Sequence, residues 1–179
     1  ILPCEVVLKK FFYLLERMEH TYKLQVALIG VGYWGKVLLQ KLILHPAVDC
    51  IWVYDINESV LNAIENVSKK VVRCATVAEA VEQPQVQAAL IATPTATHYE
   101  LAKQALQHNK HVFIEKPFVT YVEQGQELIR LASTKHRVLM VDHVFMYNPA
   151  IWLLKDLLQQ PDTGHVSYIN STRVNLGIY

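Results

Sequence analysis

The segment that most constrains the fold runs from Leu24 to Gly35 and reads LQVALIGVGYWG. A short apolar strand pattern breaks into Gly30-x-Gly32-x-x-Gly35, and a helical pattern begins at Lys36. In such a unit the first glycine permits a tight turn, the second lets a pyrophosphate approach the backbone, and the third lets the helix pack close to the strand. The helix N-terminus adds N–H groups and a partial positive charge. These features predict a dinucleotide-binding turn.

Short apolar runs alternate with helical patterns along most of the chain. Strands are expected at 48–54, 70–74, 88–92, 111–114 and 138–141, and helices at 36–45, 60–67, 99–108 and 121–133, with a capping box at Thr76-x-x-Glu79. Strands that are apolar throughout and joined by helices are typical of a parallel sheet covered on both faces. The sequence therefore predicts an α/β fold with a doubly wound parallel Rossmann sheet, whose strand-end loops meet at one crevice.

We expect three parts along the chain. Residues 1–22 form an N-terminal helical extension, residues 23–147 the NAD(P)-binding Rossmann domain, and residues 148–179 the start of an incomplete α/β domain. The last part carries a helical pattern at 151–158 and an alternating strand pattern at 166–174. We expect a truncated chain in which Ile1 is not a translation start, and whose last strand leaves an exposed edge that favours self-association.

The extension has an apolar stripe at helical spacing, made of Phe11, Phe12, Leu14, Leu15 and Met18. Charged residues interrupt this stripe, which distinguishes it from a signal peptide. Amphipathic stripes are mostly buried on their own protein, so we favour packing on the domain or on a segment upstream. A contact with another copy of the chain or with a partner is the alternative.

The composition excludes several classes of partner. Lys+Arg 17 against Asp+Glu 16 leaves almost no net charge and no basic stripe, which argues against nucleic acid. No apolar run is long enough to cross a membrane. The three cysteines, Cys4, Cys50 and Cys74, are widely spaced and match neither a metal site nor a disulfide framework. We therefore expect a cytoplasmic protein.

Asp55 lies twenty residues after Gly35, at the end of the second expected strand. A carboxylate at this place accepts hydrogen bonds from the adenosine ribose and repels a 2′-phosphate. The next residues, Ile56-Asn57, supply no Arg for that phosphate, so we expect NAD as the cofactor and NADP less. The alternative is that Asp55 is a turn or helix-capping residue, although Asn57 can provide the cap instead.

Two further strand-end loops carry candidate residues. Thr93 and Pro94 follow the fourth strand, where Pro stiffens the turn into a wall for a flat ring. His98 either reaches the crevice or is a surface histidine in a first helical turn. Glu115-Lys116-Pro117 ends the fifth strand, and a partly desolvated Lys116 could hydrogen-bond a substrate hydroxyl and share in proton transfer. A strand-end salt bridge between Glu115 and Lys116 is the alternative.

Four other residues are considered for the site. His143 and Tyr147 lie just past the sixth strand and are candidate substrate contacts. The spacing His108-x-x-His111 could suggest a metal, but no Cys or carboxylate partner stands at ligand spacing. We therefore expect these two histidines to face water and expect no metal.

Together these segments resemble the Gfo/Idh/MocA family. The matching pieces are VALIGVGYWG at 26–35, Asp55, ALIATPTATHYELAKQAL at 89–106, HVFIEKPF at 111–118 and VDHVFMYNPA at 141–150. The resemblance implies a Rossmann domain that binds NAD(P) and a C-terminal α/β domain that binds substrate and often forms a homo-oligomer. It implies a catalytic, cofactor-contacting role for Lys116. The candidate cofactor-binding residues are Gly30, Gly32, Tyr33, Trp34, Gly35, Asp55, Thr93, Pro94, His98, Glu115 and Lys116.

The family's reaction is oxidation or reduction of a sugar or cyclitol hydroxyl or ketone. YNPA and STRVNLG resemble members that act on nucleotide-linked amino sugars. Two departures matter: Asp142 replaces a glycine usual after the sixth strand, and the chain ends before the second-domain Asp/His motif. We expect residues 1–179 to bind NAD but to turn over poorly. The alternative is a non-catalytic NAD(P)-binding or interaction module.

Overall fold

The computed structural model describes residues 3–19 and 23–172. These belong to two compact units, divided between Val144 and Phe145. The first unit contains α1 (Pro3–Glu19), β1 (Leu24–Ile29), α2 (Tyr33–Leu44), β2 (Val48–Tyr54), α3 (Glu58–Ile64), β3 (Val71–Arg73), α4 (Val77–Val81), β4 (Val86–Ile91), the 3-10 turn η1 (Thr95–Thr97), α5 (His98–Gln107), β5 (His111–Ile114), α6 (Val122–Thr134) and β6 (Leu139–Val141). None of the helices in the described ranges has the length and hydrophobicity that a membrane span requires.

The six strands form one sheet in the order β3-β2-β1-β4-β5-β6, and every pair is parallel. From β1 the chain adds β2 and β3 on one side, and it then adds β4, β5 and β6 on the other side. The crevice expected of this topology lies where the two sides meet, at the carboxyl ends of β1 and β4. β2 and β5 have the bounds that their apolar runs predict. The α/β doubly wound Rossmann prediction is confirmed.

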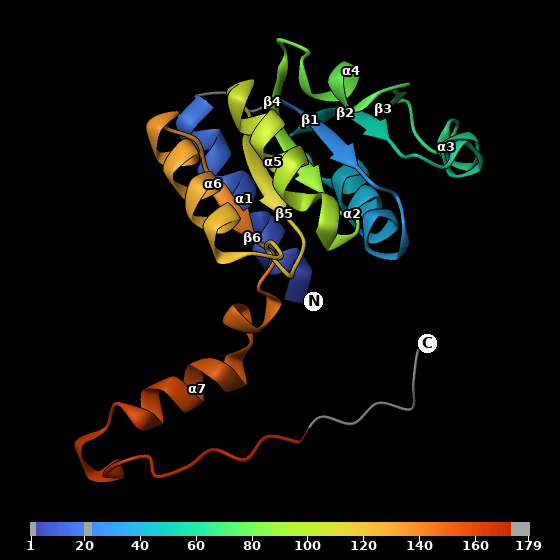
Figure 1. Cartoon of the computed structure of the whole chain (residues 1–179). Helices are drawn as coiled ribbons and strands as arrows, with labels where there is room; N and C mark the ends of the chain where they lie inside the picture. Colours follow the sequence, from blue (N-terminus) through green and yellow to red (C-terminus); the bar gives the residue numbers. More distant parts are fainter. Residues whose placement is uncertain (1–2, 20–22, 173–179) are drawn as a thin grey trace. The chain divides into compact units, whose positions relative to one another are not determined.

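Helices cover both faces of the sheet (Figure 1). On one face, strand residues such as Ile29, Ile91 and Ile114 join a buried cluster with side chains of α4, α5 and α6. Strand residues alternate between faces, so Phe113, between two members of that cluster, points to the opposite face. There α2 contacts β1 and β2. Both faces of the sheet are therefore covered, which leaves the strand ends as the place for a crevice.

Helix α1 belongs to the same unit as the sheet. Most of its apolar stripe is buried: Phe11, Phe12 and Leu15 are inaccessible and Leu14 is half-buried, whereas Met18 is exposed. The Phe11 ring lies 5.5 Å from the Phe113 ring of β5, and the Phe12 ring lies 4.5 Å from the His45 ring after α2. The favoured interpretation of the stripe, as a helix packed on the domain, is therefore the one observed.

Two expectations differ most from the structure, beyond shifts of one to three residues at the ends of other elements. Helix α2 begins at Tyr33 and not at Lys36, because its N-cap is Gly32 and Gly35 lies in the first turn. The strand predicted from 166 is wrong for the described residues 166–172, which are extended but unpaired. A strand needs a neighbour for its backbone groups, and alternation alone does not supply one. Positions 173–174 lie outside the described residues.

The second unit contains the end of the 3-10 turn η2 (Val144–Tyr147), then α7 (Pro149–Leu158) and the 3-10 turn η3 (Pro161–Thr163). Asn148 caps α7 by accepting a hydrogen bond from the Ala150 amide at 2.9 Å. All apolar side chains of α7 are exposed, among them Trp152 and Leu153. Thus this unit, described by itself, has a helix but no core around it.

Candidate cofactor site

The carboxyl ends of the strands form a continuous row of residues. One residue past each strand, backbone amides continue the ladder: Gly30 N donates to Tyr54 O at 2.8 Å, Ala92 N to Ile29 O at 2.8 Å, Glu115 N to Ile91 O at 2.9 Å and Asp142 N to Ile114 O at 2.9 Å. The loops predicted to meet at one crevice therefore start side by side. They are fixed by the sheet itself, since a paired backbone cannot slide along its neighbour.

The three glycines of the turn differ in what surrounds them. Gly30 has φ +89°, and an added Cβ would lie 2.8 Å from the Ala92 carbonyl oxygen, so the tight turn is confirmed. An added Cβ at Gly35 would lie 2.1 Å from the Gly30 carbonyl oxygen, which confirms the close packing of helix on strand. Gly32 has nothing within 4 Å of its added Cβ. Open space is thus found at the one glycine expected beneath a pyrophosphate.

Asp55 fixes the turn from the neighbouring strand. Its Oδ2 accepts a hydrogen bond from the Val31 amide at 2.6 Å, and its Oδ1 accepts one from the Asn57 amide at 2.8 Å. The cap of α3 is Asn57, which accepts from the Ser59 amide at 3.0 Å. Asp55 is therefore a turn residue but not the helix cap. A carboxylate oxygen accepts more than one hydrogen bond, so capacity remains for ribose hydroxyls.

A pocket of about 410 Å³ opens beside Gly32 and Asp55. Its walls come from the loops after β1, β2 and β4 and from helices α4 and α5, and they are mostly apolar: Ile56, Val77, Ala92, Pro94 and Leu101 line it together with Thr93 and Thr97. A mostly apolar pocket with a few placed polar groups is typical of cofactor sites. The open backbone at Gly32, the carboxylate of Asp55 and these flat walls fit the pyrophosphate, ribose and adenine of a dinucleotide.

His98 connects two of the loops. It is 1% exposed, so the surface interpretation is wrong. Its Nε2 lies 2.8 Å from the Thr93 carbonyl oxygen and its Nδ1 lies 2.9 Å from the Pro117 carbonyl oxygen. The ring therefore fixes the loop after β4 against the loop after β5.

Glu115 and Lys116 point to different environments. Glu115 is 6% exposed, whereas Lys116 is exposed to solvent. The expected partial desolvation of Lys116 is therefore wrong for the described residues, because no neighbouring element covers its side chain. Among those residues no ion pair within 4.0 Å joins Lys116 to Glu115. The Lys116-Pro117 peptide is cis.

The remaining candidates are not gathered at one place. His143 is exposed and follows Asp142 in the first unit, whereas Tyr147 belongs to the second unit. His108 pairs with Glu82 at 3.4 Å between Nε2 and Oε1. His111 is fully buried and its Nδ1 accepts a hydrogen bond from the Val138 amide at 2.9 Å, so the expectation that it faces water is wrong. Among residues 3–19 and 23–172 no group of three His, Cys, Asp or Glu side chains forms a metal site.

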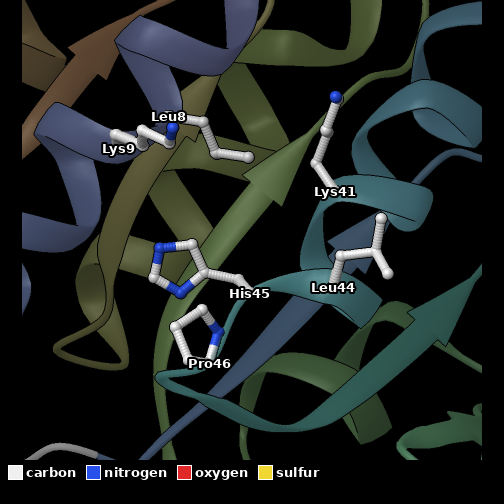
Figure 2. A pocket seen from close by; sticks show the side chains of 6 residues that line it. All are labelled: Leu8, Lys9, Lys41, Leu44, His45 and Pro46. Carbon is white, nitrogen blue, oxygen red and sulfur yellow. The ribbon is translucent and has the colours of Figure 1, made fainter.

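A second, smaller pocket of about 150 Å³ lies at the other end of α2 (Figure 2). It is lined by Leu8 and Lys9 of α1 and by Lys41, Leu44, His45 and Pro46. Burial lowers the pKa of His45, and the nearby Lys70 and Lys9 lower it further against the opposing effect of Glu16. A helix of 12 residues spans about 18 Å, so this pocket is separate from the glycine turn.

Sequence reasoning missed several residues of the site. Val77 and Leu101 line the large pocket from α4 and α5, and helical spacing alone did not distinguish them from core residues. Asp142 was noted only as a change in backbone freedom, yet it is 2% exposed. A charged residue directly after an apolar strand was the available signal, as it was for Glu115.

Comparison with known proteins agrees with this geometry. Residues 24–143 match the description "Oxidoreductase family, NAD-binding Rossmann fold" of the Gfo/Idh/MocA proteins. The chain belongs to the Gfo/Idh/MocA family. It is 32% identical over 152 residues to UDP-N-acetylglucosamine 3-dehydrogenase of Acidithiobacillus ferrooxidans, covering 84% of this chain and 45% of that enzyme. It is 27% identical over 170 residues to the scyllo-inositol 2-dehydrogenase (NADP(+)) IolW of Bacillus subtilis, covering 93% of this chain and 45% of that enzyme.

Solved structures of Gfo/Idh/MocA proteins have the same fold. GenD2 from gentamicin A biosynthesis, solved in complex with NAD, superimposes with a TM-score of 0.71 at 29% identity, covering 78% of this chain and 40% of GenD2. The chain therefore spans less than half the length of the relatives it matches. The matched part contains the Rossmann sheet and the glycine turn.

Proposed function

We propose that this chain binds NAD in the crevice and forms the cofactor-binding part of a dehydrogenase that acts on a sugar or cyclitol hydroxyl or ketone. The observation that carries the proposal is the open backbone at Gly32, next to the Asp55 carboxylate. In this proposal residues 23–147 are the cofactor domain and residues 148–179 begin the substrate domain. A nucleotide-linked sugar is the substrate class that the Acidithiobacillus relative supports.

The preference for NAD over NADP rests on charge. A 2′-phosphate beside Asp55 would meet a carboxylate, and Ile56 and Asn57 offer no cation. Arg73, at the end of β3, already has two partners: its Nη1 donates to Asn62 Oδ1 at 2.6 Å and its Nη2 lies 3.4 Å from Glu58 Oε1. An arginine held by α3 is a poor partner for a phosphate.

In the proposed reaction the residues of this chain hold the substrate and the cofactor in place. When bound, NAD supplies the acceptor for a hydride from the carbinol carbon. Lys116, exposed beyond β5, hydrogen-bonds the substrate oxygen, and in the reducing direction its ammonium donates a proton to the ketone oxygen. His98 keeps the Lys116-Pro117 loop against the Thr93 loop. Both loops then keep a fixed distance from the glycine turn.

The test is a fluorescence titration of NADH and NADPH with residues 1–179. Wild type is expected to bind NADH about tenfold or more tightly than NADPH, a difference of about 1.4 kcal/mol. Asp55→Asn removes the negative charge and keeps one acceptor oxygen, so it should weaken NADH binding and reduce the preference to about twofold. Asp49→Asn, an exposed carboxylate on the same strand, is the control and should leave both affinities unchanged. Equal binding of NADH and NADPH by wild type would contradict the proposal.

A further inference from the structure

Two buried carboxyl groups lie side by side at the carboxyl ends of β5 and β6. Glu115 and Asp142 each follow a strand, and the strands pair in register through Ile114 and Val141. The Asp142 amide extends that pairing by donating to the Ile114 carbonyl oxygen at 2.9 Å. Both side chains therefore leave the sheet on the same side. They are 6% and 2% exposed, in the row that also contains the glycine turn.

The hydrogen bonding of this pair is incomplete without a proton. Glu115 Oε1 and Asp142 Oδ1 are buried and receive no donor within the described part of the chain. Glu115 and Asp142 occupy the next paired positions after Ile114 and Val141, so the two carboxyl groups are neighbours, and each affects the pKa of the other. Ionised carboxylates only accept, so two of them repel and have no hydrogen between them. One proton on either group turns the contact into a donor–acceptor pair.

We propose that Glu115 and Asp142 share one proton at neutral pH, and that Asp142 thereby acts as a positioning residue that fixes the Lys116 turn for cofactor binding. The part concerning the cofactor rests on the proposed function. The second carboxyl comes from Asp142, which directly follows β6. The pair therefore lies at the β5–β6 end of the row of strand ends, and not in the glycine turn.

The electrostatics agree with the geometry. Burial, and then the adjacent Glu115 carboxyl, raise the pKa of Asp142 to about 7, and burial raises the pKa of Glu115. Lys116 and His143 are the positive groups that oppose the rise at Asp142. Above neutral pH the pair loses its shared proton and gains a second negative charge. The two carboxylates then repel each other, and a shift of Glu115 moves Lys116, which directly follows it in the chain.

The first experiment follows the carboxyl carbons of Glu115 and Asp142 by ¹³C NMR in the free protein between pH 3 and 9. Two separate steps are expected, with the second near pH 7. In Asp142→Asn and in Glu115→Gln, the carboxamide donates permanently, and the step near neutrality should disappear. Two carboxyls that are both ionised at pH 6 would overturn the shared proton, whether or not NADH binds.

The second experiment measures NADH affinity between pH 6 and 8.5. Wild type is expected to lose about threefold to tenfold in affinity across this range, because binding is linked to one proton. Asp142→Asn and Glu115→Gln should show no such loss, and Asp49→Asn, at an exposed carboxylate far from the pair, should retain it. A wild-type affinity that does not change with pH would overturn the positioning role. A two-step titration without any NADH binding would refute the proposed function while supporting the shared proton.

Discussion

The two halves of the crevice are built differently. Around β1 and β2 the polar groups are paired: Asp55 accepts from two backbone amides, and the glycine turn packs on the Ala92 loop. Around β5 and β6 two carboxyl groups are buried against each other, and each has an oxygen without a donor. In the first half the backbone of the Gly30–Gly35 turn, called the cradle below, is held rigidly, and this suits cofactor binding. The second half holds two buried ionisable groups with raised pKa values, which is typical of catalytic sites.

The largest expected effect tests the rigidity of the cradle. Gly35→Ala would place a Cβ 2.1 Å from the Gly30 carbonyl oxygen, and a backbone atom cannot move aside as a side chain can. We expect a loss of at least about 4 kcal/mol in the free energy of unfolding, measured by urea denaturation. The matched control is Gly32→Ala, which meets nothing within 4 Å and should cost less than about 1 kcal/mol. Equal losses in both variants would show that the cradle is not tightly packed.

A second prediction concerns the ionisation of the buried Asp142 carboxyl. The folded-state pKa of Asp142, about 7, lies above the ordinary value of 3.8, so its contribution to stability is full below pH 4 and is lost as pH rises to 7. The Asn side chain does not ionise, so Asp142→Asn does not lose this stability as the pH rises. The difference in the free energy of unfolding, variant minus wild type, should therefore increase by about 2–3 kcal/mol from pH 5 to pH 8. Asp49→Asn, at an exposed carboxylate, should show no gain beyond about 0.5 kcal/mol, and a gain there as large as at Asp142 would contradict the prediction.

The third prediction separates the two halves directly, because it expects a small effect on cofactor binding and a large effect on turnover. Lys116 is exposed, so Lys116→Ala should change NADH affinity by no more than about threefold in a fluorescence titration. In a preparation that oxidises a sugar or cyclitol, the same change should reduce turnover by about a hundredfold or more. A large loss of NADH binding with unchanged turnover would reverse the roles given to the two halves.

The sequence predicted the sheet well because its signals were local. Continuous apolar runs bounded by Gly, Pro or Asp gave the strands, and Thr76 caps α4 by accepting from the Glu79 amide at 3.0 Å, as its spacing predicts. The start of α2 was placed too late, because Gly35 was taken to lie before the helix although it packs within the first turn. Alternation at 166–172 failed for a similar reason: pairing depends on a partner that a local pattern does not reveal.

The site was predicted only in part. Strand ends gave the correct row of loops, since parallel strands all present their carboxyl ends at one edge. The positions of the strand ends did not predict which side chains are buried. His98 had a surface alternative, His111 was expected to face water and Asp142 was given no role, yet all three are buried. Each is buried by contacts from elements far away in sequence. Such contacts determine which charged groups lose water, and spacing along one strand does not contain them.

The aromatic contact between α1 and β5 has a practical consequence for dissecting the protein. The match to the family description begins at residue 24, which suggests a natural place to shorten the chain. A chain cut there would lack Phe11 and Phe12, and the Phe113 face of the sheet would meet water. Exposed apolar faces of this kind promote aggregation. The segment that precedes the family match is therefore part of the hydrophobic core.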